Sequence, residues 1–127
     1  MSIFCIDFRV FKALSQQYLD LIHDLQRQLE VLQTAIANQS EPAPAIVSDW
    51  LRSQSQIQAF FHDQIVNIEM EIKPQHLSLQ VEIDKQLKMF GVDLSMLRAA
   101  RNPTTWQKRH QQICDRLVLL NKYFQMH

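Results

Sequence analysis

Apolar residues recur every three or four positions over residues 8–38, the spacing typical of one long amphipathic helix. The residues before this stretch fit two patterns. Ile6, Phe8 and Val10 alternate with charged residues like a strand, whereas Phe4, Phe8 and Phe11 have helical spacing. We favour a helix, because a lone strand would have no partner in this chain. The expected inner face of the long helix comprises Phe11, Leu14, Tyr18, Leu21, Ile22, Leu25, Leu29, Leu32 and Ile36.

Prolines mark the next boundaries. Pro42 and Pro44 cannot continue a helix, so the first helix should end near residue 38. A second helix is expected from about 45 to 72, and the Lys73–Pro74 step ends or kinks it. Its expected inner face comprises Ile46, Trp50, Ile57, Phe61, Ile65, Ile68 and Ile72.

The last part of the chain predicts two more helices and a short connecting helix. Gly91, the only glycine, is expected to cap a third helix over 75–90 in the left-handed conformation. Asp93 would then begin a connecting helix over 94–101. Asn102 is expected to cap the last helix, with Pro103 at its first position. The expected inner faces of these two longer helices comprise Leu79, Ile83, Leu87 and Phe90, and Trp106, His110, Ile113, Leu117, Leu120 and Phe124.

These patterns predict an all-α fold: a single-domain antiparallel helical bundle of about four helices plus a short connecting helix, spanning residues 1–127. The composition agrees with this fold. Hydrophobic residues make up 46% of the chain, which is typical of a protein with a folded core. A single glycine is too few for the many tight turns of a sheet protein.

The sequence also bears on location. No stretch has the roughly 18–20 consecutive apolar residues of a transmembrane helix, and the first residues lack the basic region of a secretory signal. Two cysteines far apart in sequence, Cys5 and Cys114, do not make a disulfide scaffold. We therefore expect a cytoplasmic protein with no membrane partner.

No catalytic or cofactor motif is found in the sequence. A single glycine excludes a glycine-rich phosphate loop, and no Gly-x-Ser-x-Gly motif occurs. A metal site in a bundle would need two Glu-x-x-His pairs, and the nearest match, Asp20 with His23, occurs once. His110 lies on an apolar stripe and is expected to be a hydrogen-bonded core histidine. The expectation is a non-enzymatic binding protein with no catalytic residue, metal or cofactor.

Charge divides the chain, although the net charge is zero. Residues 1–84 carry 5 Lys/Arg against 11 Asp/Glu, and residues 85–127 carry 8 against 2. Such a basic segment neutralises phosphates or captures an acidic peptide. The alternative, left equally open, is that it faces the acidic first two helices and forms surface ion pairs worth ~0–1 kcal/mol each. The candidate residues for binding a partner or single-stranded DNA are Lys85, Lys88, Arg98, Arg101, Lys108, Arg109 and Arg116.

A set of short stretches carries a likeness to a known family: Ile6-Asp7-Phe8-Arg9-Val10-Phe11, Tyr18-Leu19-Asp20, Trp50-Leu51, Gln58-Ala59, Asp84-Lys85-Gln86-Leu87 followed by Phe90, and Arg116-Leu117. These stretches resemble the primosomal replication protein PriC family of small bacterial helical proteins. The resemblance implies a replication-restart accessory that recognises single-stranded DNA and the acidic tail of single-strand binding protein, and that helps to load the replicative helicase. Unlike the family, this chain is short and neutral, and Gln80 stands where a histidine is expected.

Lys85 and Arg116 are the only candidate binding residues within those stretches, and the others rest on charge clustering alone. A second class of function stays open: a cytosolic helical chaperone or adaptor, of the secretion or flagellar type, that offers a groove to a partner helix. Such a protein would leave an apolar stripe uncovered in the monomer, which homodimers often bury. The sequence leaves both a monomer and a homodimer open.

Overall fold

The structure, a computed structural model, describes residues 2–67 and 72–127, and the side chains of residues 16–67 and 72–127. The described part is all-α and contains no strand, which confirms the predicted fold class. The elements are α1 (Ser2–Asn38), α2 (Pro44–Phe60), η1 (Phe61–Val66), α3 (Pro74–Ala99) and α4 (Pro103–Gln125). Four helices were expected, and α1 begins at Ser2, so the first residues are helical as favoured above.

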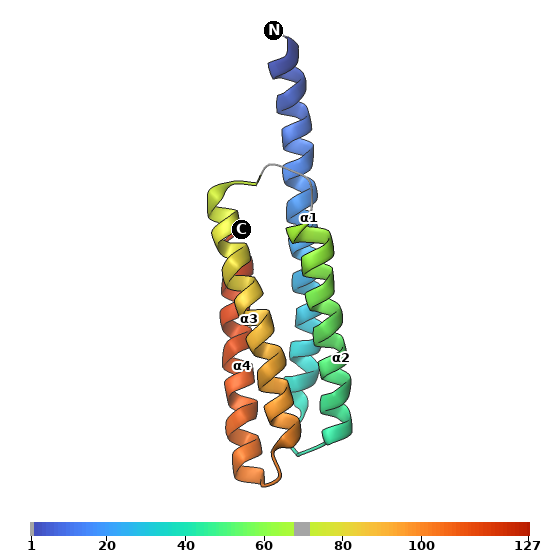
Figure 1. Cartoon of the computed structure of the whole chain (residues 1–127), viewed down its shortest axis with the longest axis vertical. Coiled ribbons are helices and arrows are strands. Elements are labelled where there is room, and N and C mark those ends of the chain that lie inside the picture. Colours follow the sequence, from blue (N-terminus) through green and yellow to red (C-terminus); the bar gives the residue numbers. More distant parts are fainter. Residues whose placement is uncertain (1, 68–71) are drawn as a thin grey trace.

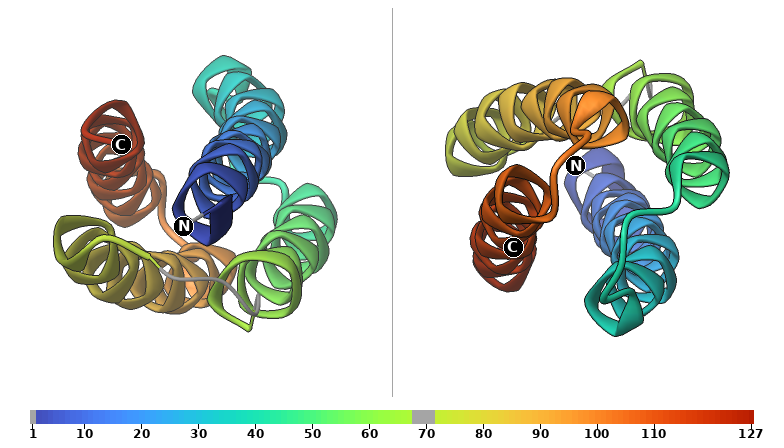
Figure 2. Two further views of the ribbon diagram at one scale, coloured as in Figure 1. Left: turned by 90° about the horizontal axis from the view of Figure 1, so that it is seen from above. Right: turned by 90° about the horizontal axis from the view of Figure 1, so that it is seen from below.

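Consecutive helices run in opposite directions along one axis (Figure 1). Each helix packs beside the next, and α4 closes the ring by packing against α1 (Figure 2). The N-terminal turns of α1 extend beyond the ends of the other helices (Figure 1). The bundle therefore has one end where α3 is joined to α4, and an opposite end from which α1 projects.

The core follows the spacing seen in the sequence. On α1 the buried residues are four and three positions apart in alternation, as expected for a helix that packs in a bundle. Each fully buried Leu, Ile or Phe side chain stabilises the fold by roughly 1.5–3 kcal/mol relative to its exposed state. The buried apolar side chains are Tyr18, Ile22, Leu25, Leu29, Leu32 and Ile36 of α1, Val47, Trp50, Ile57, Phe61 and Ile65 of α2 and η1, Leu79, Ile83, Leu87, Phe90, Leu94 and Leu97 of α3, and Trp106, Ile113, Leu117, Leu120 and Phe124 of α4.

One residue expected on an inner face is exposed, and three expected positions are not described. Ile46 was placed on the inner face of the second helix, but it is exposed and Val47 is buried instead, because α2 begins at Pro44 in a register that turns Val47 and Trp50 inward. The expected inner positions Phe11, Leu14 and Ile68 lie outside the described side chains.

The expected cap at Gly91, with a separate connecting helix after it, is wrong. α3 continues through Gly91 to Ala99 with no interruption, and Gly91 does not have a positive φ. The buried stripe explains the continuity, because Leu94 and Leu97 extend the spacing of Phe90 beyond the glycine. Asp93 therefore lies within α3 and caps no helix.

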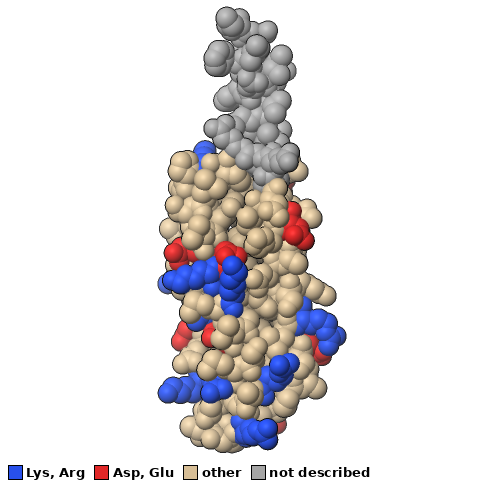
Figure 3. Space-filling view, viewed as in Figure 1, with Lys and Arg blue, Asp and Glu red and all other residues tan. Residues whose placement is uncertain are grey.

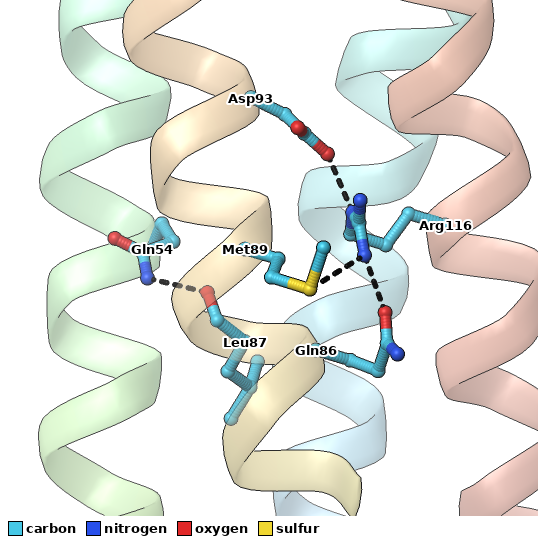
Figure 4. Close-up of polar contacts among 6 residues, drawn as sticks. All are labelled: Gln54, Gln86, Leu87, Met89, Asp93 and Arg116. Carbon is cyan, nitrogen blue, oxygen red and sulfur yellow. Dashed lines mark hydrogen bonds and ion pairs between the residues drawn. The ribbon is translucent and has the colours of Figure 1, made fainter.

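Gly91 has a packing role instead. A Cβ atom added to Gly91 would lie 3.0 Å from Nε2 of Gln54 on α2. Gln54 is buried, and its Nε2 donates hydrogen bonds to the carbonyl oxygen of Leu87 at 3.0 Å and to Oε1 of Gln58 at 2.8 Å. The bond to Leu87 joins α2 to the backbone of α3 (Figure 4). The glycine thus makes room for a polar link between two helices, a recognised use of a residue without a side chain.

Hydrogen bonds also fix the helix ends near the α3–α4 connection. Oδ1 of Asn102 accepts a hydrogen bond from the backbone N–H of Thr105 at 2.8 Å, and Pro103 opens α4, which confirms the predicted cap. Nε2 of His110 donates to the carbonyl oxygen of Ile36 at 2.6 Å, one of the last carbonyls of α1, which have no partner within their own helix. The ring of His110 also stacks on Trp106, so the expected hydrogen-bonded histidine is confirmed.

The second helix ends in a π-helical turn, which the sequence pattern does not predict. The backbone N–H of Asn67 donates to the carbonyl oxygen of His62, five residues earlier. The turn keeps Phe61 and Ile65 buried. The expectation that the second helix runs to about residue 72 is wrong, because the π-helical turn ends at Val66 and Ile72 is not helical. α3 then begins at Pro74, where the sequence predicted the boundary.

We expect Gly91→Ala to lower the free energy of unfolding by about 1 kcal/mol or more. At an exposed helical position the same change would instead stabilise the helix by about 1 kcal/mol. At Gly91 the loss arises because the new Cβ displaces the amide of Gln54 from Leu87. Urea unfolding followed by circular dichroism measures the change.

The matched background is Gln54→Ala, which removes the crowding side chain. There, Gly91→Ala should raise the free energy of unfolding, because only the helix preference remains. The same sign of change in both backgrounds would refute the assigned role of Gly91.

Candidate partner-binding surface

The structure divides the seven candidate basic residues among three places. Lys85 and Lys88 lie at the middle of α3 and are exposed. Nζ of Lys88 forms an ion pair with Oδ2 of Asp84 at 2.8 Å, one helical turn away, and the Lys88 side chain stays 57% exposed. The Asp84 side chain is only 27% exposed, but the ammonium groups of Lys88 and Lys85 both remain accessible to a partner.

Four other candidates gather at the end of the bundle where α3 joins α4. Arg98 lies in the last turn of α3, and Arg101 lies in the connection between α3 and α4. Lys108 and Arg109 lie in the first turns of α4. Arg98, Arg101 and Lys108 are exposed, whereas Arg109 is half-buried and its Nη1 donates to the carbonyl oxygen of Met96. Residues 94–114 contain no Asp or Glu. We call Arg98, Arg101, Lys108 and Arg109 the end cluster; Figure 3 shows basic side chains at this end of the molecule.

Arg116 lies apart from the others, between α3 and α4. Its Nε donates to Oδ2 of Asp93, its Nη1 donates to Oε1 of Gln86, and its Nη1 lies 3.5 Å from Sδ of Met89 (Figure 4). The side chains of Arg116 and Asp93 are only 18% and 19% exposed. The guanidinium is therefore committed to joining α4 to α3, since removal of one partner from a largely buried pair is costly.

The ion pairs test the alternative that basic residues of the segment 85–127 pair with acidic residues of α1 and α2. The described side chains form four pairs: Arg27–Asp24 in α1, Arg52–Asp49 in α2, Lys88–Asp84 in α3, and Arg116–Asp93 between α3 and α4. Among the side chains of residues 16–67 and 72–127, no pair joins α1 or α2 to α3 or α4. The described part of the chain thus leaves the charge of the end cluster without an internal partner.

An open hollow of about 680 Å³ lies beside the end cluster, between the α1–α2 connection and the start of α4. Two prolines and an indole ring supply its apolar surface. Such a hollow offers contact area to apolar side chains of an extended peptide. The lining residues are Ser40, Glu41, Pro42, Pro103, Trp106 and Gln107.

One surface feature escaped the sequence analysis. α3 exposes apolar side chains on the side opposite its buried stripe, at 39–67% exposure. The signal in the sequence is a second set of apolar residues at helical spacing in one segment, which the search for a single inner face passed over. The exposed residues are Leu77, Val81, Met89, Val92 and Met96.

A cluster of titratable groups lies at the opposite end of the bundle. Nε2 of Gln80 donates to the Tyr18 hydroxyl at 3.0 Å, and this hydroxyl lies 3.1 Å from Nε2 of His127. Nδ1 of His127 donates to the carbonyl oxygen of Tyr123, which can only accept, so neutral His127 accepts from Tyr18 at Nε2. The ring of His76 packs against both, with its centroid 5.4 Å from that of Tyr18 and 5.0 Å from that of His127.

Burial changes the acidity of this cluster. It lowers the pKa of His127 below its ordinary value, and the neighbouring His76 lowers it further. Burial, and then Lys73, lower the pKa of His76. Burial also raises the pKa of Tyr18. The lowered pKa values favour the neutral form of both imidazoles, which is the form in which Nε2 of His127 accepts from Tyr18.

Cys114, considered as a nucleophile, is half-buried. Burial raises the pKa of its thiol and Asp115 raises it further, which disfavours the reactive thiolate. Within the described residues, no three His, Cys, Asp or Glu side chains come together as a metal-ligand group. None of the described helices has the length and apolar character needed to cross a membrane.

Comparison of the chain with protein-family models, with curated proteins and with solved structures found no match. The likeness to the PriC family therefore rests on the short stretches named in the sequence analysis.

We expect the protein to lose stability as the pH falls below about 6.5, the ordinary pKa of histidine. The folded pKa values of His76 and His127 are lowered, so the unfolded chain binds more protons in this range and protonation favours unfolding. Urea unfolding at a series of pH values between 5 and 8 measures the slope.

The double variant His76→Gln/His127→Gln should flatten that slope, because it removes both groups while keeping polar side chains at these positions. An unchanged slope in this variant would show that the two histidines do not control the acid sensitivity.

Proposed function

We propose that this protein is a cytoplasmic, non-enzymatic binding protein, a PriC-like accessory of bacterial replication restart. In this role the end cluster holds the acidic tail of single-strand binding protein on stalled forks, close to the single-stranded DNA itself. The remainder of the bundle engages protein, including the replicative helicase. The proposal thus places the binding of the acidic tail and of single-stranded DNA at the end of the bundle where α3 joins α4.

One observation carries the proposal: exposed basic side chains gather on a segment of the chain that contains no acidic residue, although Glu41 of the α1–α2 connection lines the adjoining hollow. Arg98, Arg101 and Lys108 are exposed and form no ion pair with any described side chain. They lie in or beside a segment, residues 94–114, that contains no Asp or Glu. Arginine in such a cluster donates paired hydrogen bonds to carboxylates or phosphates, so the cluster suits an anionic chain.

The hollow beside the end cluster favours an acidic peptide over bare DNA as the main ligand. Pro42, Pro103 and Trp106 give it apolar surface for the non-acidic side chains of a peptide tail. The chain as a whole carries no net charge, so it lacks the long-range attraction that strong DNA binders use. Binding to single-stranded DNA would then be the weaker and more salt-sensitive of the two interactions.

The test measures fluorescence anisotropy of labelled single-stranded DNA at two salt concentrations. Three forms are compared: bare DNA, DNA coated with intact single-strand binding protein, and DNA coated with the same protein lacking its acidic tail. The proposal predicts the tightest binding to the DNA coated with the intact protein, with affinity falling as salt rises.

The triple variant Arg98→Glu/Arg101→Glu/Lys108→Glu should weaken binding to the coated DNA at least about tenfold, which corresponds to about 1.4 kcal/mol. The matched control, Lys85→Glu/Lys88→Glu, reverses charge on the same helix outside the end cluster and should retain binding. Failure of the folded wild-type protein to bind any of the three forms would refute the proposal, as would equal losses in both variants.

A further inference from the structure

α3 carries apolar residues on two opposite sides. Its buried stripe packs in the core, and its outer side exposes Leu77 by 49%, Val81 by 67%, Val92 by 59% and Met96 by 45%. Outward faces of bundle helices are normally polar, because water covers them. Among the described side chains, α4 exposes two large apolar residues, α1 exposes Val31 and α2 exposes Ile46, so the feature is concentrated on α3.

The exposed residues of α3 follow a regular spacing. With Lys85 and Lys88 between them, they are separated by four, four, three, four and four positions. Steps of three and four residues keep these side chains on one side of α3, as helix–helix packing requires, although their order is not the strict three–four alternation of a coiled coil. We call the residues Leu77, Val81, Lys85, Lys88, Val92 and Met96 the outer seam; Figure 3 looks onto this side and shows basic side chains at mid-height over α3.

A hollow of about 260 Å³ lies at one end of the outer seam, between η1 and α3. Val66 of η1 is 39% exposed there and faces the same space as Leu77 and Val81. The hollow can receive an apolar side chain of a helix that lies along α3. Its lining residues are His62, Val66, Leu77, Gln80, Val81 and Asp84.

We propose that the outer seam binds an amphipathic helix of another protein that has apolar residues toward both ends and acidic residues at its centre. The apolar ends would pack on Leu77 with Val81 and on Val92 with Met96. The central carboxylates would pair with Lys85 and Lys88. The seam covers 20 residues, so the partner needs a helix of about five to six turns, or roughly 30 Å.

The position of the lysines argues against a second copy of this chain as the occupant. The spacing of the outer seam is symmetric about its centre, which lies between Lys85 and Lys88. Two copies of α3 paired along this seam, parallel or antiparallel, would therefore place lysines against lysines. Like charges across an interface oppose pairing, so the seam selects an acidic partner.

The ion pair with Asp84 does not block this interaction. The Lys88 side chain is 57% exposed in this pair and its ammonium group has several N–H donors, so it can bind a carboxylate of the partner while it keeps Asp84, whose side chain is only 27% exposed. Lys85 forms no ion pair with a described side chain. This proposal does not rest on the one above, because the end cluster is a different surface of the molecule.

The test uses a designed helical peptide as the probe. This peptide carries Leu, Leu, Glu, Glu, Leu and Leu at the spacing of the outer seam. A matched control peptide has Lys at the two Glu positions and is otherwise identical. Because the spacing is symmetric, one peptide tests parallel and antiparallel binding. Fluorescence anisotropy should show that the wild-type protein binds the Glu peptide at least tenfold more tightly than the Lys peptide.

Lys85→Glu/Lys88→Glu should reverse that preference, so that the variant binds the Lys peptide more tightly. These side chains are exposed, and circular dichroism checks that the variant remains folded. The triple variant of the end cluster should keep the wild-type preference. The proposal would be overturned if the wild-type protein bound both peptides equally or bound neither. It would also be overturned if the protein formed a concentration-dependent dimer that Val81→Asp abolishes, because a second copy would then occupy the seam.

Discussion

The close approach of α2 to α3 at Gly91 is the constraint on which the rest of the structure depends. The amide of Gln54 reaches the backbone of α3 only because no side chain stands at that point. α2 packs there against α3, which its buried stripe through Leu94 and Leu97 keeps as one unbroken helix from Pro74 to Ala99. That continuity places the outer seam and the start of the end cluster on a single rod, with fixed spacing and orientation. A break at Gly91 would have separated Lys85 and Lys88 from Arg98.

A second set of polar contacts determines which basic side chains are bonded within the bundle and which remain exposed to solvent. Arg116 is held by Asp93 and Gln86, so this basic residue connects α4 to α3. The remaining described ion pairs join residues within one helix, three or four positions apart. The bundle is thus assembled by apolar packing together with a few buried glutamine and arginine contacts. Most of the basic charge of residues 85–127 stays at the surface.

The sequence predicted what depends on local spacing and local chemistry. The buried side of α1 follows from the positions of Ile22, Leu25 and Leu29 alone, and the cap at Asn102 needs only the next three residues. The role of Gly91 was mispredicted because its cause is Gln54, which lies 37 positions away in sequence on another helix. The partner of Arg116 was missed for the same reason. Charge clustering alone does not distinguish an arginine that joins two helices from one that faces solvent.

The central claim is that the end cluster forms no ion pair with any described side chain and is therefore free to bind a partner. The most direct test is the free energy of unfolding as a function of sodium chloride concentration between about 0.02 and 0.3 M, where screening of exposed charges changes strongly. The account predicts a constant or slightly rising value, because salt screens repulsion within the end cluster and few attractions exist to be weakened. A marked fall would contradict it, by showing that the acidic and basic parts of the chain stabilise each other.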